Sequence, residues 1–374
     1  MKKVRILHIS SAHPPQDPRL AHRVIPSLVP IYDITVLLPG ARPAMFCTTQ
    51  YISLPYFRRV VARFLLVHPI ILWRTLRLRP TLLHIYDPEL LPVARLLQLL
   101  LRIPVVYEVH ENFYKKLEQK IVTQGRLATH FFHRFDAMAQ RRFHLVFTEH
   151  AYLSTYNRLT NPSAVVYNYP SLSFLEPFRF PYSPNQQAPE FFYIGWISLE
   201  RAFDTLVAAL ARFKHHYPVF RMHLFGQRTL TDDDLEKLPG FADVREHLIF
   251  YGYIDQQQAF LTIRHTTAGI ALLKPVGDYP DSYPTKMFEY MALGLPVITS
   301  DFPLYRDIVE RYACGFCLSP DKPEQLADAL IYLVEHPHEA QIMSKKGRKA
   351  IEDRFNWETE RLKLLTLYSQ ILET

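Results

Sequence analysis

The sequence predicts an α/β protein of two domains, each built on a parallel sheet with helices on both faces. Its 374 residues are about twice the length of an ordinary domain. Short runs rich in β-branched and aromatic residues alternate with longer helical stretches, which is the pattern of a parallel sheet. A proline-rich stretch without helical periodicity, residues 171–189, separates two such series. We therefore expect domains at 1–170 and 190–355, a linker at 171–189 and a last helix at 356–374.

The first series contains six expected strands. They cover residues 4–10, 33–38, 82–86, 105–110, 145–149 and 164–168. The first run contains His8 and lacks a small-residue cleavage site, so it is interpreted as a strand and not as a signal peptide.

The second series also contains six expected strands, at residues 191–195, 221–226, 248–253, 269–273, 296–300 and 315–319. A helix of about two turns is expected between the fourth and fifth of them, over 286–293. Pro284 and Thr285 suit its entry, and Gly294 suits its C-cap.

Polar residues follow many of these strands. In open parallel sheets, ligands bind beyond the carboxyl ends of the strands. In the first half these positions hold Ser10, Ser11, His13, Tyr86, Asp87, His110, Glu111 and Asn168, and in the second half residues 195–201, Gly226, Tyr253 and Lys274. We therefore expect one binding region in each half.

Composition and motifs exclude several classes of protein. The net charge of +7 favours an anionic partner. No two of the eleven glycines are one residue apart, which excludes the dinucleotide fingerprint, and the Walker, serine-hydrolase and zinc-protease motifs are missing. Cys47, Cys314 and Cys317 form an odd set, which fits a reducing compartment such as the cytoplasm. No run approaches the length of a membrane span.

The helix expected at 286–293 offers a receptor for a diphosphate. A helix N-terminus presents unpaired N–H groups and partial positive charge, and Lys286 adds a cation in the first turn. Glu289, one turn on, can accept bonds from paired hydroxyls such as those of a ribose. A capped helix with a solvated lysine and glutamate explains the same residues equally well.

Residues 281–300 resemble the donor-binding signature of retaining family-four glycosyltransferases, in which two glutamates enclose seven residues. Glu289 matches the second glutamate, and Asp281 stands where the family often has the first. The run 283–292 is similar to the tyrosine-proline-x-lysine-x-x-glutamate-tyrosine-met-ala element of a bacterial polysaccharide subgroup.

Further similarities are spread over almost the whole chain. Gly195 followed by Arg201 resembles the family's strand, glycine and basic residue, although Trp196 stands where the family often has arginine. In the first half, the matching elements are Asp17-Pro18-Arg19, residues 84–87, residues 107–111 and Asn168-Tyr169-Pro170.

The resemblance implies a GT-B fold, in which two Rossmann-like domains face each other across a cleft and the last helix returns to the first domain. It implies metal-independent transfer, with retained configuration, from a UDP- or GDP-sugar to a hydroxyl of a lipid-linked or polysaccharide precursor, with no other cofactor. Its catalytic residues would be His110, at the sugar's primary hydroxyl or developing cationic ring, and Asp281. A buried structural histidine is the alternative for His110.

The remaining site residues fall into two groups in the same resemblance. Donor binding would use Gly195, Arg201, Tyr253, Ile254, Thr285, Lys286, Met287 and Glu289. The acceptor side would use Asp17, Arg19, Asp87 and Glu111.

Residues 57–79 predict a membrane contact. Six arginines flank an apolar stretch that contains Phe64 and Trp73, a composition typical of an interfacial anchor on anionic lipid at the inner face of the membrane. Pro69 is expected to interrupt any single helix here. Two short core helices with solvated arginines remain the alternative.

Other functions stay open. Asp281 and Trp196 motivate an inactive nucleotide-sugar-binding protein of the same fold, and an epimerase or phosphorylase would share that fold. The hypothesis of a nucleic-acid-binding protein rests on the isoelectric point alone, since the sequence contains no recognisable nucleic-acid-binding module.

Overall fold

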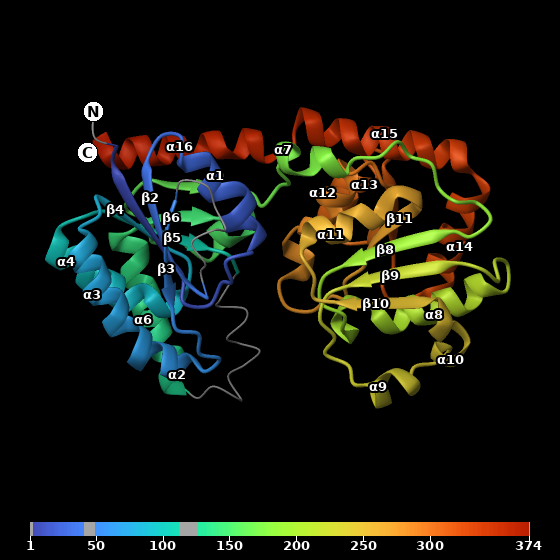
Figure 1. Cartoon of the computed structure of the whole chain (residues 1–374), viewed down its shortest axis with the longest axis horizontal. Coiled ribbons are helices and arrows are strands. Elements are labelled where there is room, and N and C mark those ends of the chain that lie inside the picture. Colours follow the sequence, from blue (N-terminus) through green and yellow to red (C-terminus); the bar gives the residue numbers. More distant parts are fainter. Residues whose placement is uncertain (1–2, 41–48, 112–125, 374) are drawn as a thin grey trace. The chain divides into compact units, whose positions relative to one another are not determined.

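The computed structural model describes residues 3–40, 49–111 and 126–373, so Cys47 lies outside the described residues. The chain divides into two compact units (Figure 1). Unit 1 is Met1–Asn168 together with Trp357–Thr374, and unit 2 is Tyr169–Asn356. The stretch expected as a linker lies within unit 2 and begins with two short helical elements, α7 (Leu172–Leu175) and η6 (Glu176–Phe178).

Unit 1 contains a parallel sheet of seven strands. They are β1 (Arg5–Ile9), β2 (Asp33–Pro39), β3 (Gln50–Leu54), β4 (Leu82–Ile85), β5 (Val105–Val109), β6 (His144–Phe147) and β7 (Ser163–Val165), in the order β3-β2-β1-β4-β5-β6-β7. β3 was not predicted, because its half-exposed edge position gives it no buried apolar run. The chain order 3-2-1-4-5-6 is that of a Rossmann sheet, whose ligands bind where the order reverses.

Helices cover both faces of this sheet. One apolar core lies under η1 (Leu20–Val24), α1 (Ile25–Leu28) and α16 (Trp357–Glu373). The other lies under α3 (His68–Leu78), α4 (Leu91–Leu101) and α6 (Arg126–Arg142). Short turns η4 (Pro88–Leu90) and η5 (His150–Ser154) follow β4 and β6. Helix α16 is therefore part of unit 1, although unit 2 precedes it in the chain.

The expected interruption at Pro69 was wrong. α2 (Val60–Ala62), the π-helical turn η3 (Arg63–Val67) and α3 follow one another without a break, and Pro69 lies in the first turn of α3. The amide of His68 already bonds Arg63 O in the wider π pattern. The wider π-helical turn directly before Pro69 is where the helix accommodates a residue that has no N–H to donate.

Unit 2 contains a six-stranded parallel sheet of the same kind. Its strands are β8 (Glu190–Ile194), β9 (Arg221–Phe225), β10 (Leu248–Gly252), β11 (Thr266–Ala271), β12 (Val297–Ser300) and β13 (Gly315–Leu318), in the order β10-β9-β8-β11-β12-β13. This is again the order 3-2-1-4-5-6, with the reversal between β8 and β11.

The larger core of unit 2 lies between its sheet and α8 (Phe203–Lys214), α10 (Phe241–Val244) and α14 (Pro323–Glu335). α12 (Thr285–Ala292) packs against β11, β12 and α15 (Pro337–Asp353). The remaining helices are α9 (Asp232–Glu236), α11 (Gln256–Phe260) and α13 (Pro303–Val309). The predicted two-turn helix is α12, shifted by one residue.

Candidate functional site

Two cations meet beside a glycine at the strand-order reversal of unit 2. Gly195 follows β8 with φ +133°, and a Cβ atom there would lie 3.1 Å from Arg201 Nη1 and 3.4 Å from Lys286 Nζ. Because Gly195 has no side chain, its backbone and the positive groups of Arg201 and Lys286 surround one small space. Gly226, after β9, approaches so closely that its own Cβ would lie 2.0 Å from Gly195 O. A side chain at either position would fill this space or displace its wall.

Lys286 is buried without a hydrogen-bond partner for its amino group within the described residues. Its side chain is only 7% exposed. Nζ instead lies 3.8 Å from the centre of the Tyr193 ring. Burial, and then the charge of Arg201, lower the pKa of Lys286 well below its usual value, whereas Glu289 opposes this shift. An anionic ligand placed here would relieve both the burial cost and the repulsion.

Arg201 is fixed by its own turn and by two tyrosines. It ends η7 (Leu199–Arg201), which Ala202 closes in the left-handed conformation with φ 54°. Burial alone would lower the pKa of Arg201, but Tyr193 and Tyr279 raise it, so the guanidinium stays charged. Its Cζ lies 5.9 Å from the centre of the Tyr279 ring.

Helix α12 directs its first turn to the same region. It begins at Thr285 after Pro284, and the Met287 amide is bonded to Pro284 O at 2.9 Å. Glu289 is buried one turn further on, where its charge acts on Lys286. Asp281 ends the turn η10 (Tyr279–Asp281) and is exposed.

A cavity of about 350 Å³ lies beside the glycines of unit 2. It lies at the ends of β9 and β10 and is lined by Gly226, Gln227, Arg228, Leu230, Phe250, Gly252 and Tyr253. Its volume falls in the range of small-molecule sites. Tyr253, expected beside the base, lines it with a side chain that is 62% exposed, whereas Ile254 is not among the lining residues.

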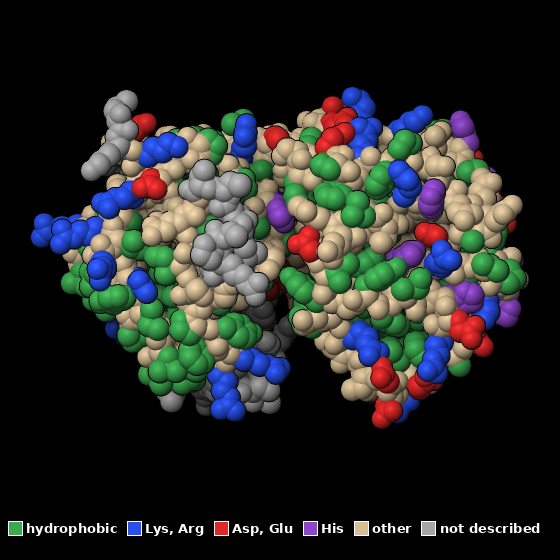
Figure 2. All heavy atoms as spheres, viewed as in Figure 1, with side chains coloured by type: hydrophobic (Ala, Val, Ile, Leu, Met, Phe, Trp, Pro, Cys, Tyr) green, Lys and Arg blue, Asp and Glu red, His purple; other side chains and the backbone are tan. Residues whose placement is uncertain are grey.

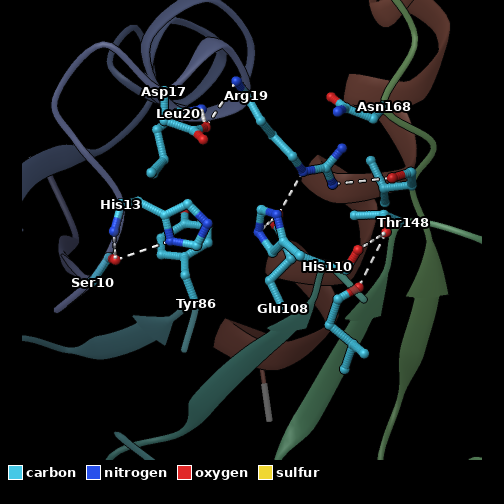
Figure 3. A network of polar contacts seen from close by, with 12 residues as sticks. Ser10, His13, Asp17, Arg19, Leu20, Tyr86, Glu108, His110, Thr148 and Asn168 are labelled. Carbon is cyan, nitrogen blue, oxygen red and sulfur yellow. Dashed lines mark hydrogen bonds and ion pairs between the residues drawn. The ribbon is translucent and has the colours of Figure 1, made fainter. Parts of the chain in front are cut away.

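In unit 1 a buried carboxylate, Glu108 of β5, gathers several polar side chains (Figure 3). Its Oε1 lies 2.5 Å from Arg19 Nε and 2.8 Å from His110 Nε2, and its Oε2 lies 3.4 Å from His84 Nε2. Burial would raise the pKa of Glu108, but Arg19, His110 and His84 hold it well below its usual value. Glu108 is therefore a carboxylate at neutral pH.

Arg19 differs from its expected role on the acceptor side. It is 2% exposed, and its guanidinium donates to Glu108 and to the carbonyls of Val166 and Tyr167. Asp17 is half-buried and accepts from the amides of Arg19 and Leu20. Both residues thus shape the turn that enters η1, and the guanidinium of Arg19 faces protein groups.

His13 and Asp87 form an ion pair at the ends of β1 and β4. The two groups lie 3.2 Å apart, and Asp87 also accepts from the hydroxyl of Ser10 and the amide of Ser11. Burial would lower the pKa of His13, but Asp87, with Asp17 and Glu108, raises it to about 9. Burial would raise the pKa of Asp87, but its bonds to His13, Ser10 and Ser11 lower it to about 2.

The structure thus brings together some of the predicted residues and adds others. His110 lies in this cluster, with its ring centre 4.9 Å from that of His13, whereas Glu111 is exposed at the next position. His13 was expected in the binding region of the first half, and His84 and Glu108 lie in the matching elements 84–87 and 107–111, but none of the three was named as a site residue. Glu108 and His110 are two positions apart and so lie on one side of the extended chain, which is a signal that could have identified the pair.

Comparisons with known proteins agree with this architecture. Residues 176–350 match the family model "Glycosyl transferases group 1". A glycogen synthase of Mycobacterium tuberculosis is 21% identical over 189 residues, an alignment that spans 48% of this chain and 43% of the relative. The matched part is thus under half the length of that curated relative.

Solved structures share the whole fold. A sucrose-phosphate synthase of Thermosynechococcus elongatus is similar with a TM-score of 0.72 and 18% identity, covering 99% of this chain and 100% of that one. HepE of Anabaena in complex with UDP-glucose has a TM-score of 0.71 and 15% identity, covering 98% and 99%. Both sheets of the chain therefore belong to a GT-B fold of two Rossmann-like domains.

Proposed function

We propose that this chain, whose residues 176–350 match the family model of the group 1 glycosyltransferases, transfers a sugar from a nucleotide sugar to an acceptor hydroxyl. The observation that carries the proposal is the pair of cations, Arg201 and Lys286, beside the bare backbone of Gly195. Departure of the nucleotide leaves negative charge on its diphosphate. Cations that are already in place stabilise that charge in the transition state more than in the substrate.

In this mechanism unit 2 binds the donor. The diphosphate lies against Gly195 and the first turn of α12, and the base lies in the cavity beside Tyr253. Arg201 and Lys286 take the place of a metal ion, and transfer proceeds with retained anomeric configuration. We propose a UDP- or GDP-sugar as donor, and the UDP-glucose complex of the similar HepE structure supports the uridine choice.

Unit 1 serves the acceptor in this proposal. Its polar residues His13, Asp87 and His110 lie at the carboxyl ends of β1, β4 and β5, where ligands of such sheets bind. Asp87 is paired with His13, and Glu111, which follows His110 in the chain, is exposed. We propose a glycan or lipid-linked hydroxyl acceptor.

Thermal unfolding with UDP, GDP, ADP and CMP tests donor binding. A bound nucleoside diphosphate at 100 times its Kd adds about 2.7 kcal/mol to the free energy of unfolding, which raises Tm measurably. No shift with any nucleotide would contradict the proposed site. Binding without transfer or donor hydrolysis would favour the inactive alternative over the enzyme.

A membrane contact through residues 57–79 is the second part of the proposal. Apolar side chains of η3 and α3 are exposed, among them Leu65 (63%), Leu66 (52%) and Trp73 (52%). Arg74 and Arg77 lie over the Trp73 ring at 4.7 and 5.7 Å. Figure 2 shows hydrophobic side chains over the α2–α4 side of unit 1 with Lys and Arg beside them. Positive charge beside exposed apolar groups suits an anionic bilayer surface.

No helix in the described part of the chain is both long and apolar enough to cross a bilayer. Flotation with phosphatidylglycerol vesicles therefore tests surface binding. We expect the chain to bind at low salt. Leu65→Glu should weaken this binding at least about 10-fold, since it puts a charge where an apolar side chain would enter the bilayer. Val219→Glu, at a position 62% exposed in unit 2, is the matched control and should change nothing. Failure of the unaltered chain to float at low salt would end this part of the proposal.

A further inference from the structure

The proposed function leaves unexplained why unit 1 buries a charge in its sheet. Glu108 is fully buried in β5, and an isolated carboxylate in such a place would be costly. Its oxygens are kept charged by Arg19, His110 and His84. Removal of Glu108 would leave Arg19 buried without its carboxylate, which is destabilising, so the two groups depend on each other.

His110 offers its two ring nitrogens very different surroundings. Nε2 is buried and lies 2.8 Å from Glu108 Oε1, an ion-pair distance, although the contact does not have the geometry of a hydrogen bond. The side chain as a whole is 20% exposed, and within the described residues no group bonds Nδ1. A carboxylate at Nε2 favours the tautomer that carries its proton there, because the opposite tautomer would point a lone pair at negative charge.

We infer that Glu108 is a positioning residue that holds the Nε2 proton of His110 and so leaves Nδ1 as the atom of His110 that meets the substrate. This assignment rests on the proposed function for its meaning, but the geometry that carries it lies within unit 1. With Nδ1 unprotonated, His110 accepts a hydrogen bond from a substrate hydroxyl.

The C-terminal helix α16 completes this arrangement. The Tyr368 hydroxyl lies 2.5 Å from His84 Nδ1, while His84 Nε2 faces Glu108 Oε2. At the start of α16, the centre of the Trp357 ring lies 5.4 Å from Arg19 Cζ, and the guanidinium of Arg19 contacts Glu108 Oε1. Side chains of α16 thus hold both groups that flank the carboxylate, and Tyr368 acts as a second positioning residue.

The first test is the tautomer itself, read by ¹⁵N NMR of histidine-labelled protein at a pH where the ring is neutral. The His110 signals are assigned by their loss in His110→Gln. We expect a protonated Nε2 and an unprotonated Nδ1. A ring that carries its proton on Nδ1, or an even mixture, would overturn the inference. This readout needs no activity, so it stands even if the chain transfers no sugar.

The second test is kinetic. Glu108→Gln should lower kcat at least about 10-fold, because a carboxylate that fixes a histidine's tautomer supports such factors, while the donor KM changes less than about 2-fold since unit 2 binds the donor. Glu108→Asp keeps the charge and should recover part of kcat. An unchanged kcat in Glu108→Gln, or a loss confined to donor KM, would contradict the positioning role.

Tyr368→Phe removes only the Tyr368 hydroxyl that contacts His84. Because this change is small, a loss of activity can be separated from a loss of folding. We expect a kcat lower by about 2- to 5-fold, the loss of one modest hydrogen bond. Tyr156→Phe is the matched control, because Tyr156 is equally buried in unit 1 but belongs to the core on the other face of the sheet. Equal effects of the two variants would show that α16 acts only through stability.

Discussion

Lys286→Met should stabilise the ligand-free protein and at the same time destroy donor binding. Methionine fills a similar volume without a charge, so the change removes a buried ammonium that lacks a partner within the described residues and is repelled by Arg201. An unsatisfied buried donor costs about 1–3 kcal/mol, and that cost disappears in the variant. For a domain of this size each kcal/mol raises Tm by about 2–4 °C.

The same change removes one of two cations from the proposed diphosphate site. The loss of one preorganised donor costs about 2.7–4 kcal/mol in the barrier, so kcat should fall by about 10²- to 10³-fold. The rise in Tm caused by saturating UDP or GDP should nearly vanish. Function and stability therefore change in opposite directions, as expected where a site keeps an unfavourable group for its ligand.

Thermal unfolding with and without nucleotide, together with a transfer assay, measures both effects. Lys349→Met is the control, because Lys349 is exposed and pairs with Asp353 at 3.0 Å on α15. It should change the free energy of unfolding by no more than about 0.5 kcal/mol. A Lys286→Met protein that is less stable than the unaltered chain, or that keeps its response to nucleotide, would refute the reasoning.

Two further changes test other parts of the structure. Gly195→Ala should abolish nucleotide binding measured by calorimetry, because its Cβ would meet Arg201 at 3.1 Å at a φ of +133°, whereas Gly40→Ala, at φ +69° with open space around it, should not affect binding. The His13–Asp87 pair gives a pH dependence: the pKa of His13 is raised to about 9, so its stabilisation is complete below about pH 6.5 and is lost as pH rises through 9. Denaturant unfolding should therefore show a fall of roughly 3 kcal/mol between pH 6.5 and 10 that His13→Gln reduces, and an equal fall in that variant would assign the effect elsewhere.

The sequence could predict the strands, and it could name three residues that the structure brings together at the proposed donor site. Buried parallel strands are continuous apolar runs, so twelve of the strands in the described chain were placed to within a few residues. Gly195, Arg201 and Lys286 were predicted from local patterns because each lies at a strand or helix end that a short motif marks. Their convergence follows from the strand order, which is a property of the whole sheet.

The Glu108 cluster could not be predicted in the same way. Its members come from β4, β5, the turn before η1 and α16, so their sequence separations reach from two residues to more than two hundred. The motif around His110 offers two acids, and only the fold decides that Glu108 is buried while Glu111 is exposed. The raised pKa of His13 likewise depends on Asp87, which arrives from another strand.

The most direct test of the account is a crystal structure of the chain with a bound nucleoside diphosphate. We predict phosphate oxygens within about 3 Å of Arg201 Nη1 and Lys286 Nζ, against the backbone of Gly195, with the base in the cavity beside Tyr253. A diphosphate bound elsewhere, with the two cations still facing each other across an empty space, would contradict the central claim.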